Sequence, residues 1–191
     1  MLISNTTPQA SITPVHGRSL TRIASGLRLA TVFGAVTTQC ILAWVWLSPD
    51  RVVTFIAARL RLEHVPLALD DGSRALGFSI SMVPAAVLFY ALYQVYRLCD
   101  GLRRGAVSWQ LSALHLQRIG WAMLAISVLR PLTNTFLSVV LTLANAADER
   151  HIVVALSTDD AMIAILGGLV LVLGRVMSEA GLIALENEQI I

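Results

Sequence analysis

Residues 29–48 read LATVFGAVTTQCILAWVWLS, a run without a single formal charge. Crossing about 30 Å of hydrocarbon takes roughly 20 apolar residues in a helix, because lipid offers no partners for backbone N–H and C=O groups. The run is long enough for this. Trp44 and Trp46 lie near its end, where amphipathic rings are typical of the headgroup level. We therefore expect a transmembrane helix here.

Three more stretches are apolar enough for the same role, namely residues 76–96, 119–144 and 160–178. The first carries no formal charge, the second contains Arg130, and the third has only a short uncharged run before Arg175. Of the 191 residues, 56% are hydrophobic and 14% are charged, which is more apolar than an ordinary soluble domain. The sequence therefore predicts an all-α fold, a four-span transmembrane helical bundle in which residues 28–191 form a single membrane domain.

The arginines indicate how this bundle is oriented. All fourteen basic residues are arginine, which we interpret as the codon bias of a GC-rich bacterial genome. Arginine-rich flanks tend to stay in the cytoplasm. With both ends of the chain inside, the cytoplasmic side holds the larger group, Arg18, Arg22, Arg28, Arg97, Arg103, Arg104, Arg118 and Arg175. We expect a multi-pass protein of a bacterial inner (plasma) membrane with both termini cytoplasmic and a disordered N-terminal stretch over residues 1–27.

The segments between the spans are short. Pro49 lies at an expected helix start, and apolar residues then recur at helical spacing as far as Glu63. We therefore predict a short amphipathic helix over residues 50–63 on the outer surface. On the inner side, Gly101 and Gly105 argue against a helix in the first part of the loop at residues 97–118.

Arg130 is the most informative residue within the spans. It lies eleven positions into residues 119–144. This is about 16 Å along a helix that rises roughly 1.5 Å per residue, near the bilayer centre. A charge there costs at least about 2.5 to 3.5 kcal/mol, so the side chain should face the bundle or water. No carboxylate is expected at that depth, so neutral hydrogen bonds should compensate Arg130. The predicted intramembrane polar site is Arg130, Gln39 and Asn134, and the alternative is an arginine that only fixes the bundle.

Two inner segments carry a family resemblance. The first places Tyr93, Tyr96, Arg97, Gly105, Val107 and Ser108 ahead of Leu116, Arg118, Ile119 and Gly120, and the second is an acidic tail with Glu179, Leu185, Glu186 and Glu188. In these residues the chain resembles the uncharacterised bacterial membrane family called domain of unknown function 2975. The resemblance implies a membrane fold. It also implies a helix-turn-helix regulator as a partner, because members often lie beside small regulators of that kind.

Several functional motifs are missing from the sequence, which argues against metal-binding, enzymatic and nucleic-acid-binding functions. The four histidines lie in different segments without metal-ligand spacing, and no phosphate loop or nucleophile elbow occurs, so we expect no metal, no cofactor and no enzymatic activity. The net charge of +2 is too small, and the arginines are too dispersed, for direct nucleic-acid binding.

Two functions in the lipid bilayer remain open. The first is a membrane sensor or anchor for a cytoplasmic regulator, with Arg103, Arg104, Arg118, Glu186 and Glu188 as candidate partner-binding residues. The second is a small transporter or channel component that works as a homo-oligomer, with Arg130 lining a polar path.

Overall fold

The computed structural model describes residues 17–57, 70–104, 109–142 and 156–188, and the regular secondary structure in these ranges is helical. The four long helices are α1 (Gly17–Trp46), α3 (Asp71–Arg104), α4 (Trp109–Thr142) and α5 (Thr158–Glu188). Between α1 and α3 lie the short helix α2 (Pro49–Arg51) and the π-helix η1 (Val52–Ala57). Each long helix contains a stretch long and apolar enough to cross a membrane, so the predicted all-α, four-span fold is confirmed.

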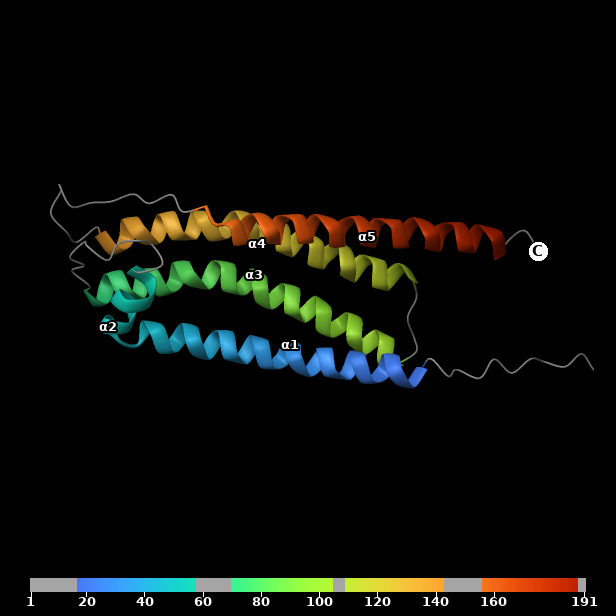
Figure 1. Ribbon diagram of the computed structural model, residues 1–191, viewed down its shortest axis with the longest axis horizontal. Helices are drawn as coiled ribbons and strands as arrows, with labels where there is room; N and C mark the ends of the chain where they lie inside the picture. The colour runs from blue at the N-terminus through green and yellow to red at the C-terminus, as the bar shows by residue number, and fades with distance from the viewer. Residues whose placement is uncertain (1–16, 58–69, 105–108, 143–155, 189–191) are drawn as a thin grey trace, which may run out of the picture.

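Neighbours in the chain are also neighbours in space (Figure 1). The helices α1 and α3, α3 and α4, and α4 and α5 pack against each other in turn, and successive helices run in opposite directions. The beginning of α1 and the end of α5 therefore lie at the same end of the molecule (Figure 1). We call this end the inner end and the opposite one the outer end, after the orientation that the arginines predict.

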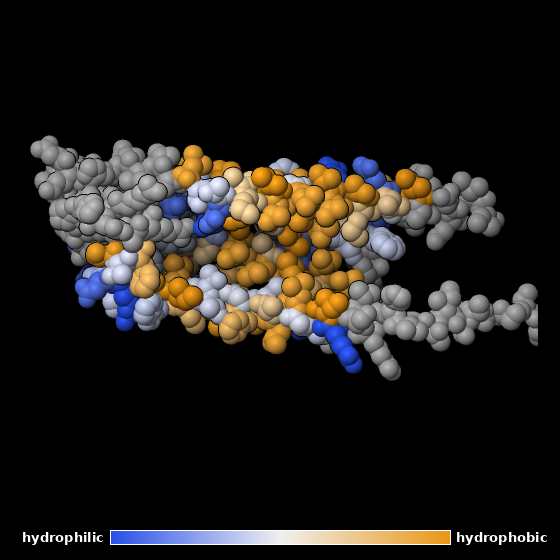
Figure 2. Space-filling model, in the orientation of Figure 1, coloured by the Kyte–Doolittle hydropathy of each residue, from blue (hydrophilic) through white to orange (hydrophobic). Residues whose placement is uncertain are grey.

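The surface of the long helices is suited to lipid. Only 11 to 22% of each apolar stretch is buried within the protein. Large apolar side chains such as Phe33, Ile165 and Leu169 are exposed, and Figure 2 shows apolar residues along the middle of the visible face. Exposed apolar surface of this extent marks a membrane or protein contact. The protein is accordingly a multi-pass membrane protein.

Glycines bring α4 and α5 into close contact. A Cβ atom at Gly120 would lie 2.8 Å from the carbonyl oxygen of Gly167 and 2.8 Å from the amide nitrogen of Leu171. A Cβ atom at Gly174 would lie 2.8 Å from Cγ of Gln117, and Gln117 Nε2 donates to the Gly174 carbonyl at 3.2 Å. Because glycine has no side chain, the two helices can approach closely at these positions, where a larger residue would not fit.

The outer end has its own small core. Trp46 of α1 and Val52 of η1 are buried together with Leu137 and Leu141 of α4. Ile56 packs against the same cluster, so one side of η1 faces the helices, while Val53 and Phe55 on η1 stay exposed. The helix predicted over residues 50–63 is thus present as α2 and η1, and its second half falls outside the described residues.

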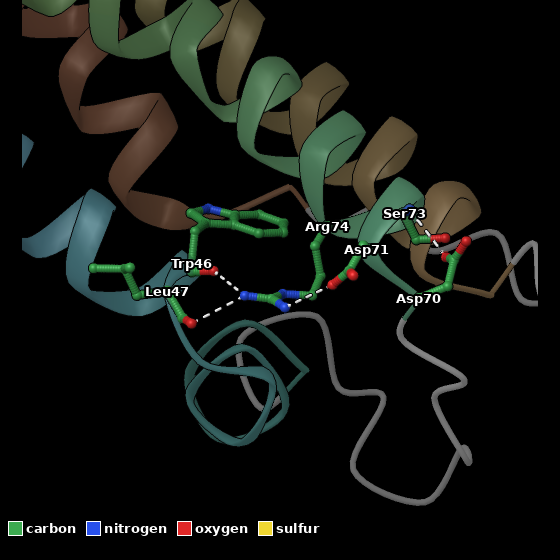
Figure 3. A network of polar contacts seen from close by, with 6 residues as sticks. All are labelled: Trp46, Leu47, Asp70, Asp71, Ser73 and Arg74. Carbon is green, nitrogen blue, oxygen red and sulfur yellow. Dashed lines mark hydrogen bonds and ion pairs between the residues drawn. The ribbon is translucent and has the colours of Figure 1, made fainter.

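Arg74 joins α1 to α3 at this outer end (Figure 3). Its Nη2 atom donates to the carbonyl oxygens of Trp46 at 2.9 Å and Leu47 at 3.0 Å, and its Nη1 atom lies 3.1 Å from a carboxylate oxygen of Asp71. The last carbonyl groups of a helix have no partner within the helix. Arg74 therefore caps the end of α1, while the Asp70 carboxylate accepts the Ser73 amide at the start of α3.

Two helix boundaries differ from those expected. The helix α1 already begins at Gly17, inside the N-terminal stretch predicted to be disordered, and residues 1–16 fall outside the described part. The helix α3 continues through Gly101 to Arg104, where a loop was expected. Extending an existing helix adds one hydrogen bond per residue and needs no new nucleus, so polar residues and a single glycine do not stop it.

Candidate functional site

Arg130 of α4 is paired with a carboxylate, contrary to expectation. Its Nη1 atom lies 3.4 Å from Oδ1 of Asp160 in the first turn of α5. This distance makes an ion pair, although Oδ1 has no partner with hydrogen-bond geometry among the described residues. The Asp160 side chain is 4% exposed and that of Arg130 is 27% exposed. The prediction that no acid lies at this depth was therefore wrong.

Asp160 is positioned by a capping box at the start of α5. The Ser157 hydroxyl accepts the amide of Asp159 at 3.2 Å, and Asp160 Oδ2 accepts the amide of Ser157 at 3.3 Å. A Ser-x-x-acid sequence before an apolar run is a typical helix start. The helix α5 therefore begins beside Arg130 and not level with Thr142, where α4 ends. Asp160 in the first turn of α5 consequently lies deeper in the bundle than the outer end of α4.

A cavity of about 610 Å³ lies next to this pair. Arg130 and Asn134 line it together with residues of α1, η1 and α3, while Ile163 is the residue that α5 contributes. Figure 2 shows the visible face hollowed between α1 and α5, with apolar side chains in the hollow. Most of the lining is apolar, and the described lining residues of α1 run from Thr38 to Trp46, which is the outer half of the first span. Arg130 thus lies level with the part of α1 that is nearer the outer end of the molecule.

The predicted polar site is brought together only in part. Arg130 and Asn134 line the same cavity, but Gln39 is not among its lining residues. The side-chain oxygen of Gln39 is buried and has no hydrogen-bond partner within the described ranges. Neither Asp160 nor Trp46 was predicted from the sequence as a site residue. The capping box could have revealed Asp160, because it fixes where α5 starts.

Trp46 carries the second unusual polar group of this cavity. The residue is 5% exposed and lines the cavity, and its Nε1 atom is buried without a hydrogen-bond partner in the described part of the chain. Figure 3 shows the indole nitrogen on the edge of the ring that faces away from Arg74. A buried donor without a partner costs about 1 to 3 kcal/mol. Such a group gains a partner if the indole ring turns toward the adjoining cavity and an acceptor is bound there.

Two of the three hydroxyl groups in the described cavity wall, those of Thr38 and Ser81, are already engaged, and the third belongs to Thr133. Thr38 donates to the carbonyl oxygen of Gly34 at 2.8 Å, and Ser81 donates to that of Gly77 at 2.8 Å. These are backbone bonds within the same helix. The polar groups of the wall that remain for a ligand are therefore mainly the N–H groups of Arg130 and Asn134 and the Thr133 hydroxyl, and the buried Trp46 N–H joins them only if the indole ring turns.

The inner end holds a second polar cluster, which ties α1 to α3. Arg28 forms an ion pair with Asp100 at 3.3 Å and donates to the hydroxyl of Tyr96, and its guanidinium carbon lies 4.4 Å from the centre of the Tyr96 ring. Two residues before Tyr96 on α3, Gln94 joins α3 to α4, because its Oε1 atom lies 2.7 Å from Nδ1 of His115. The inner ends of the helices are thus held together by polar contacts.

The candidate partner-binding residues lie at this inner end of the helices. Arg118 is exposed on α4. Arg103 and Arg104 belong to the last turn of α3, and Glu186 and Glu188 belong to the last turns of α5, but their side chains fall outside the described residues. Their role in binding a partner stays a prediction.

The comparisons with known proteins give one result. No curated protein and no solved structure matches the chain. Residues 29–191 match the family described as protein of unknown function DUF2975, which covers all four long helices except the first turns of α1. This agrees with the resemblance carried by the inner segments. The chain belongs to the family of proteins of unknown function DUF2975.

Proposed function

We propose that the protein is a membrane sensor or anchor that binds a cytoplasmic regulator at its inner end. On this proposal it resides in a bacterial inner membrane, both termini are cytoplasmic, and it has no enzymatic activity. The supporting observation is the length of the helices at the inner end. The helix α5 continues from Arg175 to Glu188, about 20 Å at roughly 1.5 Å per residue. With its 31 residues the whole helix is about 46 Å long, which is more than the roughly 30 Å that a membrane span requires.

The extension is packed rather than isolated. Gly174 of α5 touches Gln117 and Ala113 of α4, and a Cβ atom at Gly181 would lie 3.4 Å from Cβ of Trp109. The inner ends of α4 and α5 thus form a two-helix unit that a partner can bind without first ordering it. Preformed surfaces bind more tightly because less conformational entropy is lost on binding.

Charged side chains on this unit are available for a partner. Arg118, Arg175 and Glu179 are exposed, and none of them forms an ion pair with another described residue. Exposed charges of this kind steer association and suppress wrong partners. A helix-turn-helix regulator is the partner class that the family resemblance implies, and the exposed charges offer it a mixed but mainly basic surface.

Charge reversal at the inner end tests this proposal. In the Arg118→Glu/Arg175→Glu variant, capture of the neighbouring helix-turn-helix regulator by the full-length protein in detergent should fall at least about tenfold, since loss of two rim charges weakens a steered complex by about 1.4 kcal/mol or more. The measurement is co-purification with the two proteins expressed together.

The control is Asp50→Arg, a single charge reversal at the exposed outer end, half the size of the change in the double variant and opposite in sign. It should leave capture unchanged. Equal capture by the wild type, the inner variant and the outer variant would contradict a partner site at the inner end. The transport alternative has less support, because the cavity beside Arg130 is lined mainly by apolar side chains and its arginine is paired with Asp160.

A further inference from the structure

The cavity beside Arg130 has the features of a ligand site within the membrane. We propose that it binds a lipid-soluble quinone, with the flat carbonyl-bearing head among Trp46, Arg130 and Asn134 and the apolar tail leaving through the hollow between α1 and α5. This inference goes beyond the cytoplasmic partner of the proposed function and does not depend on it.

The polar lining selects a ligand that accepts hydrogen bonds. The Trp46 N–H group in the wall is buried without a partner, so it reaches an acceptor in the cavity only after the indole ring turns, and an indole nitrogen can only donate. The guanidinium of Arg130 is also donor-only. Its contact with Asp160 lacks hydrogen-bond geometry, which leaves its N–H groups available to a second acceptor. Carbonyl oxygens are the ligand groups that fit these donors.

The charges indicate that the ligand is neutral. Arg130 and Asp160 form an ion pair, so the net charge that this pair contributes next to the cavity is zero. An anionic headgroup would place a second negative charge beside the Asp160 carboxylate in a medium of low polarity, where an unbalanced charge is costly. A neutral molecule with acceptor oxygens avoids this cost.

The remaining lining fits a flat ring with an apolar tail. Trp44, Trp46 and Phe55 line one part of the cavity, and the Trp44 and Phe55 rings lie 5.8 Å apart between centroids. Aromatic walls favour flat, polarisable rings. The volume of about 610 Å³ is in the range of small-molecule sites, and the other walls are mostly aliphatic. Among neutral membrane-soluble molecules, a prenylated quinone combines a flat ring, two carbonyl oxygens and an apolar tail.

Tryptophan fluorescence provides the test, because quinones quench tryptophan at short range. The protein is placed in quinone-free phosphatidylcholine nanodiscs in a Trp109→Phe/Trp121→Phe background, so that the two remaining tryptophans are those that line the cavity. Titration with decylubiquinone should give saturable quenching. A Trp44→Phe/Trp46→Phe/Trp109→Phe variant, which keeps only the exposed Trp121, should show weak quenching that rises linearly without saturation.

Removal of the donors should then weaken binding. In the same background, Trp46→Phe keeps the ring but loses the N–H group, and Trp44 remains as the reporter. The half-saturation point should rise about tenfold, and Asn134→Leu should raise it by about the same factor. A carbonyl-free alkylbenzene of the same chain length should not displace the quinone.

Three results would overturn the proposal. The first is linear quenching of equal slope for the cavity tryptophans and for Trp121, which would mean that the hollow holds bulk lipid only. The second is an unchanged half-saturation point in both donor variants. The third is equal displacement by the carbonyl-free analogue. This last control uses the unaltered cavity, so it does not depend on the stability of any variant in the cavity wall.

Discussion

Replacement of Arg130 by leucine should lower the free energy of unfolding by about 3 to 5 kcal/mol, which is the usual cost of leaving one member of a buried ion pair without its partner. In this variant the Asp160 carboxylate, which is 4% exposed, would stay buried without its cationic partner. The measurement is thermal or denaturant unfolding in detergent, together with the yield of folded protein.

A second substitution shows whether the lost stability comes from the broken ion pair or from the loss of the arginine side chain itself. Asp160→Asn removes the charge and keeps an oxygen that can accept the Ser157 amide, so Arg130→Leu/Asp160→Asn should recover most of the lost stability. Arg175→Leu is the control, because Arg175 is exposed and a surface substitution usually changes stability by no more than about 0.5 kcal/mol. Strictly additive losses in the double variant would show that the two side chains are not coupled.

Gly120→Ala should have the second largest effect, a loss of about 1 to 3 kcal/mol of stability with weaker packing of α4 on α5. The added methyl group would lie 2.8 Å from backbone atoms of Gly167 and Leu171. Backbone cannot move aside as a flexible side chain can, so the helices must separate. The unfolding midpoint and disulfide crosslinking between cysteines introduced into α4 and α5 would both report the change.

Gly168→Ala is the matched control for this prediction. It makes the same chemical change one residue from Gly167, but its Cβ atom would meet nothing within 4 Å. Alanine favours a helix over glycine by about 0.8 to 1.0 kcal/mol, so this variant should be as stable as the wild type or slightly more stable. Similar losses at Gly120 and Gly168 would mean that helix separation is not the cause.

The spans could be predicted because their cause is local. A stretch such as residues 29–48 must form a helix in lipid whatever its neighbours are, since its peptide groups have no other partners. Helix ends are less local. The helix α1 starts at Gly17 and α3 continues through Gly101, because an existing helix extends at little cost into sequence that would not begin one.

The candidate site could be predicted only in part, because its partners come from the register between helices. Arg130 is conspicuous in the sequence as a charge in an apolar run, whereas Asp160 resembles an ordinary loop acid until α5 is aligned with α4. That alignment depends on close contact at Gly120, Gly167 and Gly174. None of these three glycines was predicted from the sequence as part of the site. The unpaired Trp46 nitrogen depends on side-chain orientation, which no spacing rule gives.

The topology of the chain in the membrane is the most direct test of this account. Tags at both ends should be inaccessible to protease in intact spheroplasts and should become accessible after permeabilisation. In a chain with Cys40 and Cys99 replaced by alanine, a cysteine introduced at Asp50 should react with an impermeant maleimide from outside. Ends that report opposite faces of the membrane, or a chain that stays soluble without detergent, would contradict the four-span arrangement.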